Sequence, residues 1–435
     1  MAGHTTRCKL AIDWRQRAGL LSRYTGGNAV NLKYNETYQK FREEVRDFLT
    51  QNWTPEDVAA NPVVNELRRG LGGGARTDER ATEFRRAAVS EGYLYRSVPR
   101  AYGGSEQQAD PLKATIIAEE FHNAKAPYEL SNQGPAMLVP TLLAHGTEEQ
   151  KTTYIESTLM GHIRWCQGYS EPGAGSDLAA LRTSGVLEGD AWVVNGQKIW
   201  TSNASDADMM FALIRTEPDA PKHDGITYML IDMKSPGLDI RPLRQMDGEA
   251  HFNEIFFDDV RVPRDSIVGD RGNGWKVSRS TLKAERALIG NASMQRRTLD
   301  GAVALAQLTE VRGRKAIEDP AVREKLADLD ARVCAAEFNG YRLLTAGHRG
   351  EDPGLSGLVT KLYASQLSYD IAMLALEISS DRAMLGQGEA AAPFDGMMMG
   401  SFNGAFMLAL GGGAPNIQRN VIGERGLGLP RDVRK

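Results

Sequence analysis

Apolar residues recur every three or four positions over residues 36–53, where Phe41, Val45, Phe48 and Leu49 fall on one side of a predicted amphipathic helix. Further helices are predicted over 79–91 and 111–123, and another begins within 145–151. A glycine-rich loop at Gly70–Gly74 formally matches a nucleotide-binding fingerprint, but no buried strand precedes it. We therefore predict an all-α domain over residues 34–162 and no nucleotide loop within it.

The pattern changes to that of β-strands between residues 163 and 270. A short apolar run at Ile163–Tyr169 is followed by a turn-rich loop and then by alternating residues that predict a β-hairpin with its turn at Gly189-Asp190. A second turn is predicted at Asn195-Gly196. The further strands predicted are Met209–Arg215, Ile226–Met233 and Glu254–Val260. These elements predict a middle β domain.

From Trp275 onward the pattern is helical again. Helices are predicted over 275–310, 320–349, 354–380 and 396–409, and a last one follows Ala414. Asp319 is the predicted N-cap of the second, with Pro320 at its first position. Residues 271–435 are thus predicted to form a helical domain. Residues 1–33, which hold six basic residues and one acid, are interpreted as an extension that is disordered or that precedes the true start.

Charge and cysteine content narrow the class of protein. The 435 residues include 52 basic and 56 acidic ones, a net charge of −4 that argues against a dedicated nucleic-acid binder. Three scattered cysteines and seven histidines without ligand spacing predict neither a disulfide framework nor a metal site. They favour a reducing compartment. We expect the cytoplasm of a bacterium, with the mitochondrial matrix as the alternative for a eukaryotic protein. No apolar run approaches the roughly 20 residues of a membrane helix.

The stretch from Ile163 to Ser202 concentrates the candidate chemistry. Gly173 and Gly175 allow the backbone to approach a ligand and to present its N–H groups. Hydroxyl groups and one flat aromatic face are available at Ser170, Ser176, Trp200, Thr201 and Ser202. This set suits a planar cofactor with many hydrogen-bonding groups, together with a ligand that carries phosphate.

The two segments YSEPGAGSD (169–177) and NGQKIWTS (195–202) closely resemble linked motifs of the acyl-CoA dehydrogenase family of flavoproteins. The resemblance covers about residues 34–432. It implies an α+β fold of three domains: a helical N-terminal domain, a middle β-barrel or sheet domain, and a C-terminal four-helix bundle. It also implies FAD-dependent α,β-dehydrogenation of an acyl-CoA thioester in lipid metabolism, with electrons passed to an electron-transfer flavoprotein, in a homo- or hetero-oligomer such as a dimer of dimers.

The resemblance implies two alternative positions for the general base. The position near the C-terminus falls on Gly412, which has no side chain to accept a proton. The other position, used by isovaleryl- and long-chain-type members, falls on Glu285. The spacing supports it independently, because Glu285 shares one predicted helical face with the apolar residues Leu282, Leu288, Ile289 and Ala292. A structural salt bridge is the alternative explanation for this acid.

Roles for other residues follow from the resemblance alone. The residues implied in FAD binding are Gln167, Tyr169, Ser170, Trp200, Thr201, Ser202, Gly413 and Gln418, and those implied in acyl-CoA binding are Ser176, Arg286 and the backbone N–H of Gly412. Ordinary turn capping is the alternative for the serines, and core packing the alternative for Trp200.

The chain departs from the family pattern at two segments that normally help to bind the cofactor across subunits. Glu310–Ala316 replaces an Arg-x-x-Phe-Gly-x-Pro segment, and Ser379–Gly386 replaces Gln-x-x-Gly-Gly-x-Gly. Two further functions therefore stay open. One is a non-catalytic partner subunit of a hetero-oligomer, and the other is a flavin monooxygenase or oxidase, such as a nitroalkane oxidase, on the same scaffold.

Overall fold

The structure, a computed structural model, describes residues 35–60, 79–130, 132–289, 292–311, 313–386 and 388–430. The predicted N-terminal extension and the loop at Gly70–Gly74 lie outside these residues. None of the helices in the described parts is both long and apolar enough to cross a membrane.

The first part of the chain is helical, as predicted. Its helices are α2 (Glu36–Asn52), α3 (Pro55–Ala60), α5 (Glu79–Ser90), α6 (Pro111–Asn123), the π-helical turn η2 (Gly134–Leu138), α7 (Val139–His145) and α8 (Glu148–Leu159). Aromatic side chains join three of them, because the ring of Phe84 on α5 packs against Phe48 of α2 and Phe121 of α6. The α8 helix begins at a capping box in which Thr147 and Gln150 bond each other's backbone N–H.

The middle of the chain forms a seven-stranded sheet. Its strands are β1 (Trp165–Gly168), β2 (Ser184–Glu188), β3 (Ala191–Ser202), β4 (Met209–Arg215), β5 (Ile226–Asp232), β6 (Leu238–Leu243) and β7 (Phe252–Pro263). They follow the order β1-β4-β2-β3-β7-β6, with β5 paired to β4. Alternate residues of β4 enter two different cores: Phe211 packs toward the N-terminal helices, whereas Met210 and Ala212 pack inside the β domain. This two-sided burial explains the nearly continuous apolar sequence of β4.

The hairpin turn at Gly189-Asp190 is confirmed, because β2 and β3 pair directly across it. The prediction of a turn at Asn195-Gly196 is wrong. These residues lie inside β3, where the register against β7 shifts between Val194 and Gly196 and the φ of Gly196 is +141°. Gly196 thus adopts the backbone conformation that a β-bulge requires, and β3 continues through it as far as Ser202.

The last part of the chain is again helical. It comprises α9 (Gly274–Ile289), α10 (Ala292–Leu308), α11 (Pro320–Arg349), α12 (Leu355–Ser379), α13 (Met397–Leu410) and α14 (Pro415–Val421), with a small hairpin of β8 (Glu310–Val311) and β9 (Arg314–Lys315). Asp319 caps α11 as predicted, since its side chain accepts from the N–H of Ala321. Apolar residues of α10, α11 and α12 form a separate core.

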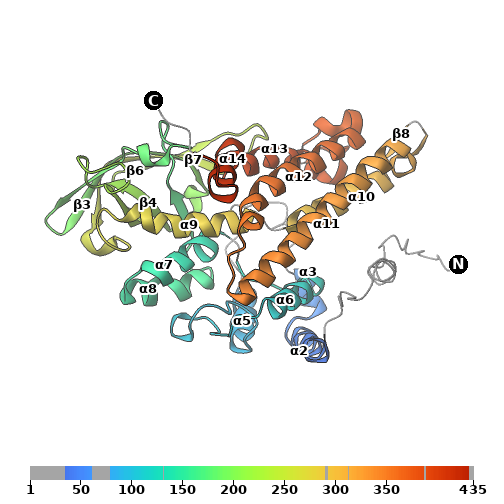
Figure 1. Ribbon diagram of the computed structural model, residues 1–435, viewed down its shortest axis with the longest axis horizontal. Helices are drawn as coiled ribbons and strands as arrows, with labels where there is room; N and C mark the ends of the chain where they lie inside the picture. Colours follow the sequence, from blue (N-terminus) through green and yellow to red (C-terminus); the bar gives the residue numbers. More distant parts are fainter. Residues whose placement is uncertain are drawn as a thin grey trace.

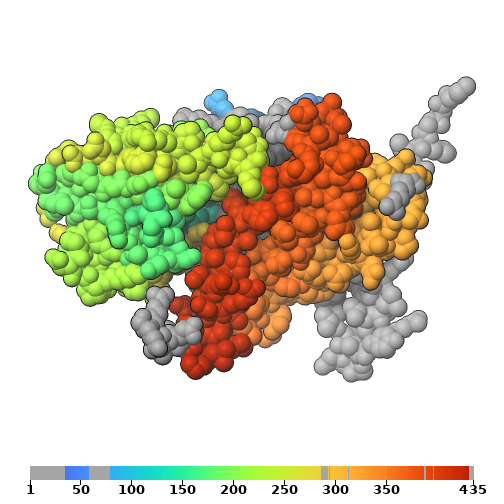
Figure 2. Space-filling model, turned by 90° about the horizontal axis from the view of Figure 1, so that it is seen from above, coloured from blue at the N-terminus to red at the C-terminus, as the bar shows by residue number. Residues whose placement is uncertain are grey.

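Helix α9 lies where the three parts meet (Figure 1). It contacts α7 and η2 of the N-terminal part, β5 of the sheet and α12 of the C-terminal helices. Polar contacts fix it: the hydroxyls of Thr141 and Thr281 are 2.9 Å apart, and Nε2 of His145 is 2.9 Å from Oγ of Ser280. In the space-filling view the red C-terminal segments lie next to the green and yellow β domain (Figure 2).

Candidate active site

The loop that follows β1 is held on β3 by a buried ion pair. Oε1 of Glu171 is 2.8 Å from Nζ of Lys198, and the same carboxylate accepts from the N–H groups of Arg182 and Thr183. Burial lowers the pKa of Lys198 to about 8, against the opposing charge of Glu171. Burial acts to raise the pKa of Glu171, but Lys198 and the backbone donors lower it overall. The pair is therefore ionised at neutral pH and anchors the loop.

The two predicted ligand-facing glycines of this loop lie at the surface. A Cβ added to Gly173 or to Gly175 would meet no protein atom within 4 Å. Neither has a positive φ. Packing inside the chain thus does not require glycine at either position, and the space beside the backbone is open to a ligand.

A second bulge places Trp200 at the surface beside this loop. The register between β3 and β7 shifts between Lys198 and Thr201, and Trp200 has a φ of +61°, a strained value for a bulky residue. Its indole is 59% exposed and meets the ring of Phe252 edge to face. The N–H of Ile199 donates to the carbonyl of Ser170 at 2.9 Å, so the strand before Trp200 and the start of the loop are neighbours.

The two residues that follow Trp200 are less exposed than its indole, and they differ in burial from each other. Thr201 is fully buried, and its hydroxyl has no hydrogen-bond partner in the described chain. Ser202 is half-buried at the end of the strand, opposite Phe252. An unpartnered buried hydroxyl is costly in a folded protein and calls for an explanation, for which a bound cofactor is a candidate.

The ring of Tyr169, a residue implied in FAD binding, does not lie open to a cofactor. Its side chain is buried, with its ring edge to face against Phe211 and Tyr228. Its hydroxyl makes no hydrogen bond of ordinary geometry in the described chain, although the hydroxyls of Thr281 and Tyr228 lie close enough to affect its pKa. Burial is the main cause that raises the pKa of this hydroxyl well above its usual range, and the charge of Glu285 adds to it. The side chain of Tyr169 thus extends toward α9.

Glu285 is half-buried on α9, one helical turn beyond Thr281. Its carboxylate acts electrostatically on Tyr169 at the end of β1 and on Lys361 of α12. The predicted base therefore lies between the sheet and the C-terminal helices.

The turn from Gly411 to Ala414, called the glycine loop below, is held from behind by two buried side chains. Nε2 of Gln418 donates to the carbonyl of Gly412 at 2.9 Å, and Nζ of Lys361 donates to the carbonyl of Gly413 at 2.7 Å. A trans peptide directs its N–H opposite to its C=O. The N–H groups of Gly413 and Ala414 therefore point away from Gln418 and Lys361, and neither donates a hydrogen bond to the described chain.

A chain of contacts joins most of the predicted site residues. Its hydrogen bonds run from Ile199, next to Trp200, to Ser170, and from Lys361 and Gln418 to the glycine loop, and the charge of Glu285 links the two parts by acting on Tyr169 and Lys361. Gln167 is half-buried within β1, and Ser176 is exposed in the loop. Arg286 belongs to α9, but its side chain is outside the described part of the structure. The individual roles stay predictions.

Three residues of this region were missed by sequence analysis. Glu171 and Lys198 are distant in sequence, and nothing in either segment indicates that they pair. A partial signal did exist for Lys361, because it is one of only three charged residues in a helix that is largely apolar. Lysine is almost never fully buried without partners, so its position predicts specific acceptors.

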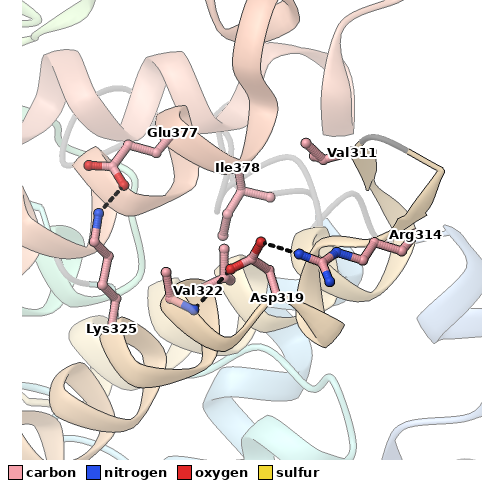
Figure 3. A pocket seen from close by; sticks show the side chains of 8 residues that line it. Val311, Arg314, Asp319, Val322, Lys325, Glu377 and Ile378 are labelled. Atoms are coloured by element: carbon pink, nitrogen blue, oxygen red, sulfur yellow. Dashed lines mark hydrogen bonds and ion pairs between the residues drawn. The ribbon is translucent and has the colours of Figure 1, made fainter.

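Two surface cavities lie elsewhere. One of about 290 Å³ lies between the β8–β9 hairpin, the start of α11 and the end of α12 (Figure 3). Its charged residues are paired with each other: Arg314 with Asp319 at 3.0 Å, and Lys325 with Glu377 at 2.5 Å. The second is lined by residues of α8, the β2–β3 turn and the segment after β7. Neither contains a predicted site residue. No three His, Cys, Asp or Glu side chains of the described residues are grouped as metal ligands.

Comparison with known proteins gives one family for all three parts of the chain. Residues 35–162, 166–260 and 272–427 match the models of the N-terminal, middle and C-terminal domains of acyl-CoA dehydrogenase. The chain is 37% identical over 405 residues to the acyl-CoA dehydrogenase IpdE1 of Mycobacterium tuberculosis, covering 91% of this chain and 99% of the relative. It is also 36% identical over 355 residues to FadE34 of the same organism, covering 80% of this chain and 46% of that relative.

Solved structures agree with these matches. The structure titled Tcur3481-Tcur3483 steroid ACAD has a TM-score of 0.74 and 29% identity, covering 93% of this chain and all of the other. The ChsE4-ChsE5 complex from Mycobacterium tuberculosis has a TM-score of 0.72 and 29% identity, covering 92% of this chain and all of the other. With three consecutive domain models matched and a relative of this identity along nearly its full length, the chain belongs to the acyl-CoA dehydrogenase family and is an oxidoreductase.

Proposed function

We propose that this protein removes two hydrogens from the α and β carbons of an acyl-CoA thioester, giving the 2-enoyl-CoA, with Glu285 as the general base. FAD is the proposed cofactor, an electron-transfer flavoprotein the proposed electron acceptor, and the cytoplasm the proposed location. The observation that carries the proposal is the position of Glu285 on α9, between the end of β1 and the glycine loop, where Gly412 offers no carboxylate.

The residues at the ends of β1 and β3 fit FAD. Trp200 offers an exposed flat face, and the adjacent Thr201 has a buried hydroxyl without a partner in the described chain. The backbone at Gly173 and Gly175 is open on its outer side. We assign Trp200, Thr201, Ser202 and Ser170 to the cofactor. When bound, FAD supplies the acceptor for the hydride that leaves the β-carbon.

The chain's own residues perform the proton chemistry. The carboxylate of Glu285 takes the α-proton, and the electron pair of that C–H bond moves toward the thioester carbonyl. The free N–H groups of the glycine loop, for which we now propose Gly413 and Ala414 in place of the Gly412 N–H implied by the resemblance, stabilise the negative charge that develops on the thioester oxygen. Both groups are needed together, because an α-proton of a thioester is only weakly acidic.

The test is Glu285→Gln, compared with Glu324→Gln, an exposed acid on α11. Each purified holoenzyme is mixed anaerobically with acyl-CoA, and the bleaching of the flavin is followed by stopped flow. General-base catalysis contributes about 10²–10⁴-fold, so Glu285→Gln is expected to slow bleaching by that factor while Glu324→Gln does not. Bleaching at the wild-type rate in Glu285→Gln would overturn the assignment.

We infer that the acyl group is bulky and ring-bearing. The support is similarity to a structure titled as a steroid ACAD, at 29% identity over almost the whole chain. Turnover of a panel of CoA thioesters, from straight chains to steroid side chains, is measured by mass spectrometry. Preference for short straight chains would contradict this inference and leave the role of Glu285 untouched.

We also propose that the active assembly contains a second, homologous chain. The segment at Glu310–Ala316 is folded back as the β8–β9 hairpin, closed by an ion pair of Lys315 with Glu310 at 2.8 Å. Two structures similar to this chain carry titles that join two different proteins. Apolar side chains at the end of α13 are exposed, Phe406 by 41% and Leu410 by 68%, which suits burial by a partner. Flavin content and mass in solution, measured with and without a co-expressed homologue, test this. Full flavin loading in a homo-oligomer would contradict it.

A further inference from the structure

Lys361 is a buried cation that no part of the proposed chemistry yet uses. It lies on α12 and is 2% exposed. Its ammonium donates to the carbonyl of Ala409 at 2.9 Å and to that of Gly413 at 2.7 Å. Both acceptors are neutral. A buried ammonium that contacts only neutral carbonyls is costly, so its retention calls for a reason beyond packing.

The charged group that acts on Lys361 is the carboxylate of Glu285. Burial lowers the pKa of Lys361, and the negative charge of Glu285 acts in the opposite direction. The ammonium thus donates to the glycine loop and lies within electrostatic range of the predicted base.

The hydrogen bond to Gly413 has a direct consequence for the next N–H group. The carbonyl of Gly413 and the N–H of Ala414 belong to one peptide unit and point in opposite directions. A charged donor on the carbonyl polarises this unit and makes its N–H a stronger donor. Gln418 holds the preceding peptide in the same way but without a charge, through the carbonyl of Gly412.

We propose that Lys361 is a positioning residue of the active site, which aims and polarises the N–H of Ala414 in the glycine loop toward the thioester oxygen and supplies positive charge behind the developing enolate. The proposal rests on the proposed dehydrogenation. Lys361 does not contact the substrate, since it acts through the peptide between Gly413 and Ala414.

A purely structural role makes a different prediction. The carbonyl of Ala409 belongs to the last turn of α13, where backbone acceptors lack partners within the helix. An amine that only satisfied this helix end would stabilise the fold and leave the acidity of the substrate unaffected.

The experiment measures α-proton transfer without oxidation. The holoenzyme is incubated in D₂O with a CoA thioester that has no hydrogen on its β-carbon, and deuterium uptake at the α-carbon is followed by NMR. The variants are Lys361→Met, Lys361→Gln, which keeps a donor but loses the charge, and Lys361→Arg. The matched control is Lys325→Met on α11, an exposed lysine paired with Glu377.

The expected result is a loss of α-exchange of about 10²-fold in Lys361→Met, by analogy with removal of one oxyanion donor, at unchanged FAD content. Lys361→Gln is expected to lose a similar factor, Lys361→Arg to recover part of it, and Lys325→Met to match the wild type. Hydrogen–deuterium exchange of the glycine-loop amides, followed by mass spectrometry, is expected to accelerate in Lys361→Met, including in the apoprotein.

Wild-type α-exchange in folded Lys361→Met would overturn the proposal. If Lys361→Met does not fold, Lys361→Gln decides in the same way, with wild-type exchange overturning the proposal and a loss supporting it. Failure of the proposed function looks different, because then Glu285→Gln exchanges the α-hydrogen as fast as the wild type does.

Discussion

The carboxylate of Glu171 and the ammonium of Lys198 form an ion pair of 2.8 Å in which the glutamate is 8% exposed and the lysine is fully buried. The glutamate comes from the loop after β1, and the lysine comes from β3, two residues before Trp200. The pair thus connects the two segments that carry the proposed cofactor contacts.

Removal of one partner is expected to destabilise the protein strongly. Glu171→Gln leaves the buried ammonium of Lys198 without its counter-charge, and breaking a buried pair in this way costs about 3–5 kcal/mol. The double variant Glu171→Gln/Lys198→Met removes both charges and is expected to regain most of the lost stability. Chemical unfolding of the two single variants and the double variant measures this, and additive effects of the two substitutions would contradict it.

The same pair predicts a dependence of stability on pH. Burial acts to raise the pKa of Glu171, but Lys198 and the backbone donors lower it below its ordinary value of 4.5. Because the folded pKa is the lower one, this stabilisation is present above about pH 4.5 and disappears as the pH falls through the folded pKa. The free-energy difference between wild type and Glu171→Gln, measured from pH 7 to pH 3, is expected to shrink toward acid. A constant difference would show that Glu171 does not titrate in this way.

Trp200→Ala is expected to weaken FAD binding without destabilising the apoprotein. The indole is 59% exposed, and aromatic stacking contributes about 0.5–1.5 kcal/mol, or up to roughly tenfold in affinity. Val186 on β2 is a matched control, since it is 61% exposed in the same sheet, and Val186→Ala is expected to leave FAD affinity unchanged. Release of FAD, followed by its fluorescence, measures both. Equal effects of the two substitutions would contradict a stacking role.

Two buried threonines offer a contrast. The hydroxyl of Thr201 has no partner in the described chain, whereas that of Thr227 is 2.6 Å from the hydroxyl of Thr216 and accepts from the N–H of Gly272. Thr201→Val should therefore leave the unfolding free energy of the apoprotein unchanged or higher, while FAD affinity falls by about 0.5–1.5 kcal/mol. Thr227→Val should lower the stability of the apoprotein by about 1–3 kcal/mol. Unaltered FAD affinity in Thr201→Val would exclude its hydroxyl from the cofactor site.

Gly413→Ala should disturb the glycine loop. Gly413 has a φ of +107°, and an added Cβ would lie 2.5 Å from Nε2 of Gln418. We expect a loss of about 1–3 kcal/mol in stability together with reduced turnover. In Gly404→Ala, by contrast, the new Cβ inside α13 meets nothing within 4 Å, and a gain of about 0.5–1 kcal/mol is expected. Thermal unfolding and turnover of both variants check this, and full activity of Gly413→Ala would show that the loop has room to adjust.

The fold was predictable in segments where apolar residues recur with one clear period, or follow one another without interruption. The strand Met209–Arg215 and the helices at 111–123 and 320–349 have the predicted bounds, because continuous apolar runs and cap residues such as Asp319 act locally. Gly196 was misjudged because a glycine after an asparagine suits a turn, and only pairing of β3 with the distant β7 makes it a bulge. The strand Leu238–Leu243 was not predicted, since it is an exposed edge strand with little apolar pattern.

The site was predictable only in part, for a similar reason. The motif around Trp200 and the acid at Glu285 stand in recognisable local patterns. The buried direction of the Tyr169 side chain depends instead on Phe211 and Tyr228, which belong to other strands. The apolar neighbours of Lys361 indicate that it needs acceptors, but its acceptor Gly413 lies about 50 residues later in the chain, and no local pattern identifies it.

Because α9 contacts all three parts of the chain, each of them contributes to the orientation of the Glu285 carboxylate. A substitution at Thr141 or His145 removes a contact of α9, to Thr281 or to Ser280, and is expected to shift the helix that carries the proposed base. This limits how acyl specificity can change in this fold. The N-terminal helices can be altered to suit a different substrate only if Thr141 and His145 keep their contacts with α9.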